Sequence, residues 1–251
     1  MGICLQTSDR RKPKYESESD MSNGYEMKEK DRTYASSLKV VGDISPPQPV
    51  NTPNQLKTCK VLDKTATKVG MFTPEECEKI IEMGLTWESA LGNIQTKSHD
   101  EEFEPNTDYR NCMIYTPPGD DLEPWLWIGE KISEQIYAFN STNGWKFDLV
   151  GMAERPMMME YVEGEGKYDW HIDLGPGKVP CTRKIAFSVN LNDDFEGGEL
   201  QIMTGRDPIV PAEQVAGTMI FFPTYMCHRI TKVTKGTRRA IVGWLHGNSF
   251  V

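Results

Sequence analysis

The sequence predicts a mostly β protein of the α+β class, with supporting helices placed before a run of short strands. From residue 145 onward, short apolar segments alternate with turns that contain Gly or Pro, as around 185–192 and 217–222. Two earlier segments instead space their apolar residues at the helical period. Many short strands joined by such turns within one unit favour a jelly roll.

The first 56 residues are expected to lie outside this domain. Residues 12–32 mix charges with Ser, Asn and Gly and contain almost no aliphatic side chain, and 45–53 reads as a Pro-rich extended linker. We therefore expect a disordered polar tail and linker over 1–56 and a folded domain over 57–251. Gly2 and Cys4 resemble an acylation signal, but Gln6 stands where that signal has Ser or Thr, so an unmodified end is favoured.

Two helices are predicted before the strands. Thr73 is a capping residue, Pro74 suits the first helical position, and Glu76 completes a capping box. The buried face of this helix is expected to comprise Cys77, Ile80, Ile81 and Leu85. A second helix should begin near Asp121 or Leu122 and end near Phe139. Its apolar stripe is expected to comprise Leu126, Ile128, Ile132 and Ile136.

Strands are predicted for the apolar segments that lie between turn signals. Their ranges are 110–115, 145–152, 155–162, a strand that ends near 173, 185–192, 199–203, 217–222 and 238–245. The Gly- and Pro-rich segment 174–180 is expected to be a loop.

Composition and charge bound the class of protein. The formal net charge of −9 argues against a generic nucleic-acid binder, which normally carries a basic excess. No run of about 18 apolar residues predicts a membrane span, and the start of the chain lacks a signal-peptide pattern. The six cysteines have no CxxC spacing, so we expect reduced thiols in the cytoplasm. They are Cys4, Cys59, Cys77, Cys112, Cys181 and Cys227.

A candidate metal site begins with His171 and Asp173. On one strand, residues i and i+2 face the same side, so these two side chains should point together. His228 lies 57 residues later (228 − 171) and can supply a second imidazole. Two imidazoles and one carboxylate form the facial triad of non-haem Fe(II) oxygenases. By itself a His-x-Asp triplet is also compatible with an ordinary hydrogen-bonded pair, and Zn²⁺ could bind the same three ligands.

Arg238 follows His228 by ten residues (238 − 228). Arginine can hold a carboxylate through two parallel hydrogen bonds, so a cation near the metal suits a cosubstrate with a distal carboxylate. On the predicted last strand, Arg238 shares a face with Ala240, Val242 and Trp244. Arg239 should face the opposite side and be mainly solvent-exposed or lie on an outer sheet face.

These features occur in a familiar order: Tyr161, Tyr168, His171-Ile172-Asp173, Gly197-Gly198-Glu199-Leu200, His228 and Arg238. In this order and spacing the chain resembles the Fe(II)- and 2-oxoglutarate-dependent dioxygenases, specifically the prolyl-4-hydroxylase-like group, from about Met71 to the C-terminus. The resemblance implies a double-stranded β-helix (jelly roll) with helices packed outside, so 57–251 would be the dioxygenase domain.

The resemblance also implies an activity. His171, Asp173 and His228 would bind Fe(II). The cosubstrates would be 2-oxoglutarate and O₂, the by-products succinate and CO₂, and ascorbate a reductant. The expected reaction is hydroxylation of a C–H bond, with a prolyl residue of a peptide or protein as the first target. Lysyl residues, a free amino acid or another small molecule also fit, and the oligomeric state is left open.

Further roles are implied by position. Arg238 would bind the distal carboxylate of 2-oxoglutarate, with Tyr161 near the cosubstrate and Asn190 where relatives often have Tyr or Thr. The substrate side of the pocket would comprise Tyr168, Arg183 and Trp244. His99 and His246 fall outside the pattern and are read as structural.

Two other functions were weighed. A non-catalytic binding module of the same fold would need no intact triad, so the intact triad with Arg238 favours the enzyme. Halogenases of this fold replace the carboxylate ligand with a small residue, and Asp173 argues against that reaction.

Overall fold

The computed structural model describes residues 64–95, 103–119, 123–142 and 144–249. The predicted tail and linker, and His99, lie outside these ranges, so the domain boundary near residue 57 stays a prediction. Among the described residues, no helix has the length and apolar character needed to cross a membrane.

Helix α2 (Pro74–Gly84) begins as predicted. The hydroxyl of Thr73 accepts from the backbone N–H of Glu76, and the Glu76 carboxylate accepts from the backbone N–H of Thr73, which completes the capping box. Cys77 and Ile80 are buried, whereas Leu85 is 47% exposed. The prediction for Leu85 was wrong because the helix ends at Gly84, so Leu85 caps the helix and does not extend its buried face.

Helix α3 (Glu123–Thr142) also forms, but its buried stripe differs in one position. Leu126 is 43% exposed, and its neighbour Trp125 takes the buried place. The stripe therefore comprises Trp125, Ile128, Ile132 and Ile136.

This correction predicts different stabilities for two substitutions in α3. Ile132→Ala should lower the free energy of unfolding by about 2–5 kcal/mol, because it leaves a cavity in the core. Leu126→Ala removes a similar side chain from the exposed face and should change it by about 0.5 kcal/mol or less. Urea denaturation followed by circular dichroism measures both values. Equal losses would contradict the assigned orientation of the helix.

The strands form a large sheet and a smaller one, and all their pairings are antiparallel. The large sheet has the order β1-β14-β10-β17-β8-β6-β2, and β7 also pairs with β17. Its strands are β1 (Ala66–Lys68), β2 (Glu88–Leu91), β6 (Met113–Thr116), β7 (Leu149–Gly151), β8 (Met157–Val162), β10 (Arg183–Asn190), β14 (Met219–Pro223) and β17 (Thr237–Gly247).

The smaller sheet has the order β13-β12-β15-β9-β5. Its strands are β5 (Arg110–Asn111), β9 (Lys167–His171), β12 (Leu200–Met203), β13 (Pro208–Ile209) and β15 (His228–Ile230). Two further pairs join β3 (Asn93–Gln95) to β4 (Phe103–Pro105) and β11 (Glu196–Gly197) to β16 (Val233–Lys235). A short 3₁₀ turn, η2 (Pro180–Thr182), precedes β10.

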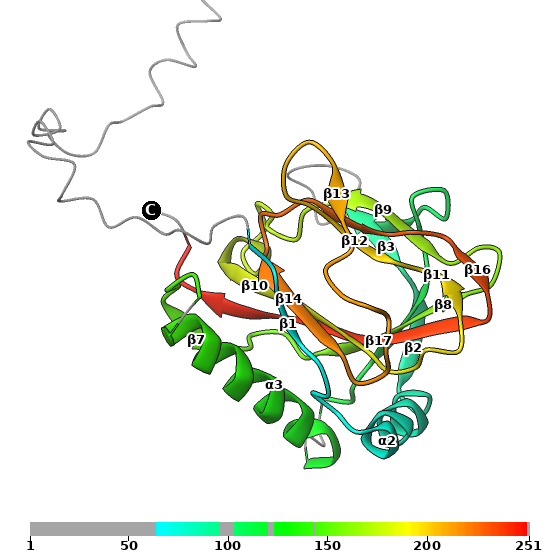
Figure 1. The fold of residues 1–251 in the computed structure, drawn as a ribbon, viewed down its shortest axis with the longest axis horizontal. Coiled ribbons are helices and arrows are strands. Elements are labelled where there is room, and N and C mark those ends of the chain that lie inside the picture. The colour runs from blue at the N-terminus through cyan, green and yellow to red at the C-terminus, as the bar shows by residue number, and fades with distance from the viewer. Residues whose placement is uncertain (1–63, 96–102, 120–122, 143, 250–251) are drawn as a thin grey trace, which may run out of the picture. The chain divides into compact units, whose positions relative to one another are not determined.

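Two separate apolar cores hold these layers together. One lies between the helices and the outer face of the large sheet and includes Ile80, Ile132 and Ile241. The other lies between the two sheets and includes Met159, Ile202 and Trp244. Figure 1 shows both helices on one side of the large sheet, away from β9 and β12. This is the predicted jelly roll with helices packed outside.

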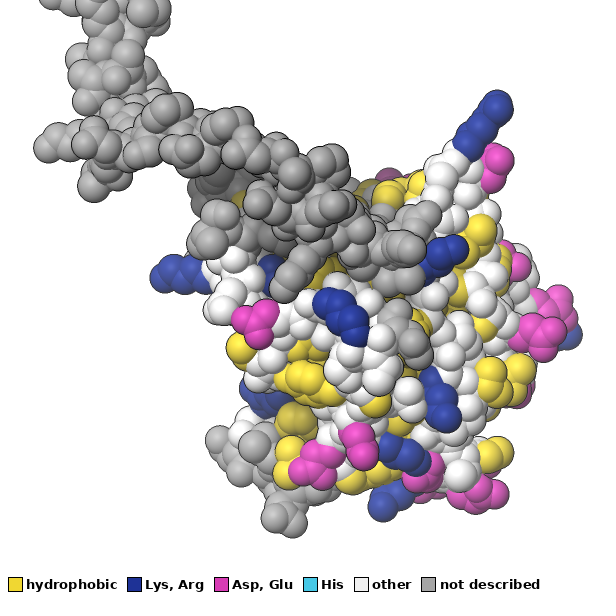
Figure 2. Space-filling model, turned by 60° about the vertical axis from the view of Figure 1, so that its left-hand side comes forward, with side chains coloured by type: hydrophobic (Ala, Val, Ile, Leu, Met, Phe, Trp, Pro, Cys, Tyr) yellow, Lys and Arg dark blue, Asp and Glu magenta, His cyan; other side chains and the backbone are white. Residues whose placement is uncertain are grey.

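On the face drawn in Figure 2, basic and acidic side chains are interspersed around exposed apolar ones. Neither sign of charge gathers there into a continuous patch.

Two predicted strands differ most from the observed ones. The segment 110–115 divides between the sheets, because β5 pairs with β9 whereas β6 pairs with β2 and β8. The predicted strand 145–152 shortens to β7. Lys146 has a positive φ of 62° and interrupts the extended backbone there, and Asn140 binds both backbone groups of Phe147.

The Gly197-Gly198 pair has a steric role beside Arg238. Both residues have positive φ, 73° and 60°, which favours glycine. A Cβ on Gly197 would collide with the backbone oxygen of Lys232, and one on Gly198 would lie 3.0 Å from Cδ of Arg238. The motif therefore lets the backbone pass close to Arg238.

Candidate metal centre

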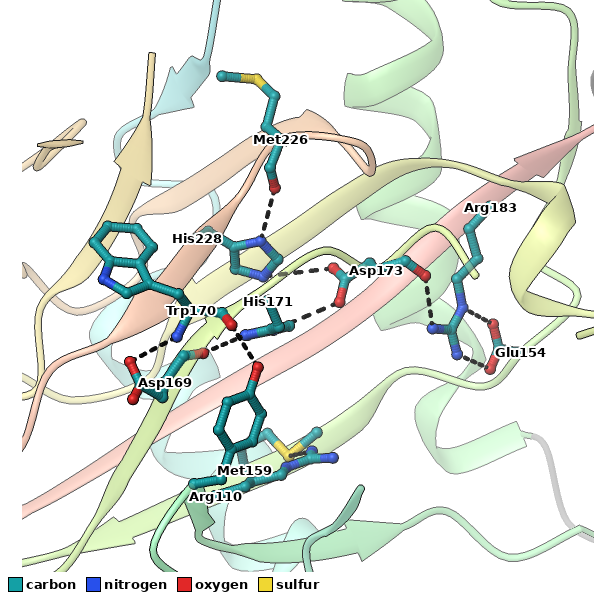
Figure 3. A network of polar contacts seen from close by, with 11 residues as sticks. Arg110, Glu154, Met159, Asp169, Trp170, His171, Asp173, Arg183, Met226 and His228 are labelled. Atoms are coloured by element: carbon teal, nitrogen blue, oxygen red, sulfur yellow. Dashed lines mark hydrogen bonds and ion pairs between the residues drawn. The ribbon is translucent and has the colours of Figure 1, made fainter. Parts of the chain in front are cut away.

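The two candidate imidazole ligands come from neighbouring strands. His171 ends β9 and His228 begins β15, and the two residues are directly paired across the antiparallel sheet. Their ring centroids lie 4.1 Å apart. Nε2 of His171 lies 3.6 Å from Oδ1 of Asp173, and Nε2 of His228 lies 3.5 Å from Oδ2 (Figure 3). One donor atom from each of the three side chains lies within 4.8 Å of the others.

Backbone carbonyls determine which nitrogen of each ring is the hydrogen-bond donor. Nδ1 of His171 lies 2.7 Å from the carbonyl oxygen of Asp169, and Nδ1 of His228 lies 3.1 Å from that of Met226 (Figure 3). A carbonyl oxygen can only accept, so Nδ1 carries the proton in each ring. Nε2 is therefore the nitrogen that each ring turns toward the Asp173 carboxylate, which is how histidine ligands are commonly oriented in metal sites.

Burial reinforces this arrangement. Burial, together with the adjacent His228, lowers the pKa of His171 to about 3. The ring is then neutral at pH 7, and a neutral imidazole is the metal-binding form. Two imidazoles and a carboxylate form a donor set that fits a divalent cation, and Fe(II) in particular.

Asp173 reaches the site from a bend two residues beyond β9, not from the strand itself. Its backbone N–H donates to the carbonyl oxygen of Thr224 over 3.0 Å. The Trp244 side chain is hydrogen-bonded to its carboxylate. Ile172, between the two ligands, is 53% exposed and faces away, as the alternation predicted.

The triad lies in a cavity of about 950 Å³ that also contains Arg238 and Tyr161. Strand pairing places Arg238 opposite Tyr161, with the guanidinium carbon 5.4 Å from the tyrosine ring centroid. Arg238 is 1% exposed. Its Nη2 donates to Oδ1 of Asn190 at 2.9 Å and to the Ser188 hydroxyl at 3.4 Å.

Two nitrogens of Arg238, Nε and Nη1, have no hydrogen-bond partner among the described residues. Burial lowers the pKa of Arg238, but a guanidinium remains charged at neutral pH. A buried cation with unused donors is costly unless an anion binds it. This position therefore fits a carboxylate, and Asn190 supports Arg238 from the side.

Arg239 faces the opposite side of β17 from Arg238, as expected, and is half-buried there on the outer face of the sheet. Its guanidinium binds the Glu160 carboxylate, at 2.7 Å from Nε and 2.6 Å from Nη2. Glu160 also accepts from the Tyr115 hydroxyl, so this outer face carries a polar cluster of its own.

The three residues expected on the substrate side lie along the cavity wall. The Tyr168 ring stacks on His171 with centroids 3.5 Å apart. The guanidinium carbon of Arg110 lies 4.5 Å from the centroid of the Tyr168 ring. Trp244 is 9% exposed. The Arg183 guanidinium is bound within the chain, to Glu154 and to the backbone carbonyl of Asp173 (Figure 3).

Sequence reasoning missed several residues around the site. His246 was read as structural without partners, yet its Nδ1 lies 2.9 Å from the Thr182 hydroxyl and its Nε2 lies 3.3 Å from Oε2 of Glu154. Glu154 in turn binds Arg183. The pairing of β10 with β17 sets Arg183 opposite His246, and no local pattern in the sequence reveals that pairing.

The jelly roll holds two histidines, an aspartate and a buried arginine in one cavity. Residues 156–246 match the model of the 2OG-Fe(II) oxygenase superfamily. That segment contains all three candidate ligands and Arg238. Fe(II) and 2-oxoglutarate are the metal and cosubstrate that the family and the triad imply.

Curated relatives include PKHD-type hydroxylases. The chain is 36% identical over 91 residues to one from Hyphomonas neptunium, covering 33% of this chain and 39% of that protein. It is 35% identical over 130 residues to one from Synechococcus sp. strain CC9902, covering 49% and 56%. The matches thus span well under two thirds of the length of these relatives.

Solved structures share the fold. A prolyl hydroxylase from Trichoplax adhaerens, in complex with a hypoxia-inducible-factor peptide fragment, superposes with a TM-score of 0.60 at 15% identity, over 72% of this chain and 83% of that one. A prolyl-4-hydroxylase from Pseudomonas putida gives 0.53 at 17% identity, over 73% and 92%.

Proposed function

We propose that the protein is an Fe(II)- and 2-oxoglutarate-dependent dioxygenase that hydroxylates a C–H bond, with a prolyl residue of a peptide or protein as its target. The observation that carries this proposal is the presence of two complementary features in one cavity. The triad offers three metal ligands, and Arg238 offers two unused donors for an acid.

Each side chain has a defined role in this proposal. His171, Asp173 and His228 would hold Fe(II), and Nε and Nη1 of Arg238 would bind the distal carboxylate of 2-oxoglutarate. Bound together, the metal and cosubstrate supply the oxidative decarboxylation to succinate and CO₂ that accompanies hydroxylation. Tyr161 closes the cavity beside Arg238, and the buried walls exclude water from the bound acid.

The wall around the triad supports a substrate with an apolar side chain. Met157, Met159 and Val242 line the cavity together with Tyr168 and Trp244. A pyrrolidine ring suits such a surface, since aromatic and aliphatic walls favour apolar rings. The solved prolyl hydroxylases make prolyl peptides the first substrates to test. Lysyl residues, free amino acids and other small molecules are the alternatives.

Two other functions have less support. A zinc hydrolase would use the same triad but would leave the buried donors of Arg238 without a purpose. A non-catalytic binding module would not require three metal ligands, two of them histidines held in one tautomer by backbone carbonyls. A cytoplasmic location agrees with the free thiols of the described cysteines, Cys77, Cys112, Cys181 and Cys227. Ascorbate would serve as the reductant that maintains Fe(II).

The test is a titration followed by product analysis. Under anaerobic conditions, Fe(II) and 2-oxoglutarate together should produce a visible metal-to-ligand absorption band, and EDTA should remove it. Admission of O₂ with a prolyl peptide should then yield succinate and a peptide heavier by one oxygen atom. Lysyl peptides and free amino acids serve as competing substrates. Failure of the protein to bind Fe(II) and 2-oxoglutarate together would overturn the proposal.

Deletion of residues 1–56 is expected to leave 2-oxoglutarate turnover nearly intact. The segment has too few apolar residues to dock on the domain, so it should contribute little to the site. Succinate release by the truncated and full-length proteins is compared at equal Fe(II) loading. A large loss in the truncated protein would show that the tail helps to form the site.

A further inference from the structure

A network of side chains connects Asp173 to the paired ends of β10 and β17. We call it the Asp173 clamp and define it by its members, Thr182, Arg183, Glu154, Trp244 and His246. In Figure 3, Arg183 and Glu154 lie on the opposite side of Asp173 from the two histidines.

Arg183 is the centre of the clamp. Its Nη1 donates to the backbone carbonyl of Asp173 over 3.2 Å. Its Nε and Nη2 donate to the two oxygens of Glu154, at 2.6 and 2.5 Å. This parallel pair is the strongest geometry available to an arginine and a carboxylate. Every nitrogen of the guanidinium therefore has an acceptor within the chain.

Trp244 gives the clamp a second contact with Asp173. The guanidinium of Arg183 lies 3.6 Å from the centroid of the Trp244 ring, which is a close cation–π contact. The Trp244 side chain is also hydrogen-bonded to the Asp173 carboxylate. Arg183 therefore contacts Asp173 directly, through its backbone carbonyl, and indirectly, through the Trp244 ring.

The outer end of the clamp is anchored in the sheet. Oε2 of Glu154, which accepts from Arg183, lies 3.3 Å from Nε2 of His246. His246 is 1% exposed, and its Nδ1 lies 2.9 Å from the Thr182 hydroxyl. This contact is within ion-pair distance but does not meet hydrogen-bond geometry, so His246 supports Glu154 by packing and charge beside its two bonds to Arg183.

We propose that Arg183 is a positioning residue that orients Asp173 as a metal ligand, with Glu154 and His246 as its support. Asp173 lies in a bend beyond β9, so no strand pairing holds its side chain in place. The two histidines are instead fixed by backbone carbonyls. The clamp therefore supplies the orientation that the backbone does not. The inference rests on the proposed metal site.

The competing role for Arg183 is a direct contact with the substrate. Its side chain is only 16% exposed, and all its nitrogens are already used. A substrate contact would require the Glu154 pair or the Asp173 contact to break. The two roles predict different effects of substitution, because a substrate contact changes KM whereas a positioning residue changes metal binding.

The test measures Co(II) binding to the apo full-length protein by visible absorption, which reports both affinity and ligand geometry. Arg183→Ala should weaken Co(II) binding by about 10- to 100-fold and shift the absorption bands of the loaded site, as removal of an outer partner of a metal ligand commonly does. Arg183→Lys keeps the positive charge but loses the planar guanidinium and its parallel donors, so it should restore only part of the Co(II) affinity. If Arg183→Ala fails to fold, Arg183→Lys and Glu154→Gln provide the measurement.

Arg239→Ala is the matched control. Arg239 also forms a short pair with a glutamate, Glu160, and is comparably half-buried, but it lies on the opposite face of β17 from the site. Its loss should leave Co(II) affinity and spectrum unchanged. Any general effect of removing a buried arginine pair would appear in both variants.

The outcomes separate the clamp from the proposed function. If the wild-type protein binds no Co(II), the metal site fails and the clamp fails with it. If the wild type binds Co(II) and Arg183→Ala binds it equally well with the same spectrum, only the clamp is overturned. A rise in substrate KM with unchanged Co(II) binding would assign Arg183 to the substrate instead.

Discussion

Asp173→Ala should abolish the Fe(II)-dependent conversion of 2-oxoglutarate to succinate and leave the fold intact. The substitution removes one of three ligands and the charge that balances the cation, and two imidazoles alone form a poor Fe(II) site. The fold survives because the backbone contact of Asp173 with Thr224 does not involve its side chain. His171→Ala should have the same effect. Succinate release and thermal unfolding are the measurements.

Asp169→Ala is the control for this result. Asp169 is also an aspartate on the same segment, but it contacts His171 only through its backbone carbonyl, which alanine retains. Its carboxylate accepts from the neighbouring N–H of Trp170. The variant should therefore keep most of its activity. Normal turnover by Asp173→Ala with iron would show that the triad is misassigned.

Arg238→Ala should weaken 2-oxoglutarate binding by about 30-fold to several thousand-fold, which corresponds to a loss of about 2–5 kcal/mol. Arg238 is buried, and it has two unused donors facing the cavity. The cosubstrate carboxylate would lose its only buried arginine partner on β17. Anaerobic titration of 2-oxoglutarate into the Fe(II) protein, followed by the metal-to-ligand absorption band, measures the change.

Arg239→Ala should have little effect in the same titration, since its guanidinium binds Glu160 on the opposite face. The comparison tests the strand register itself. Weak binding by Arg239→Ala with near-normal binding by Arg238→Ala would require β17 to be shifted by one residue.

Local periodicity was sufficient to predict the parts of the site that a single strand determines. Alternation places Arg238 and Trp244 on one face of β17, and the structure has both in the cavity. The same reasoning placed His171 and Asp173 together, although the strand ends before Asp173. A bend can bring the side chains at positions i and i+2 together, as a strand would.

Contacts between distant strands were beyond sequence reasoning. The neighbours of Arg183 are determined only when β10 pairs with β17 and brings His246 opposite it. Likewise, segment 110–115 has the composition of one strand, but its two halves bind different sheets. Pairing partners depend on the whole packing arrangement, which no local window of sequence contains.

The two faces of β17 have a consequence for how this protein can evolve. Val242 and Trp244 line the cavity, whereas Ile241 and Leu245 belong to the core beneath the helices. Substitutions that adapt the cavity to another substrate can therefore accumulate without disturbing the core. A single-residue insertion or deletion in this strand would exchange the two faces and lose catalysis and stability in one event. Divergence in this part of the chain should proceed by substitution, with the length of the strand held constant.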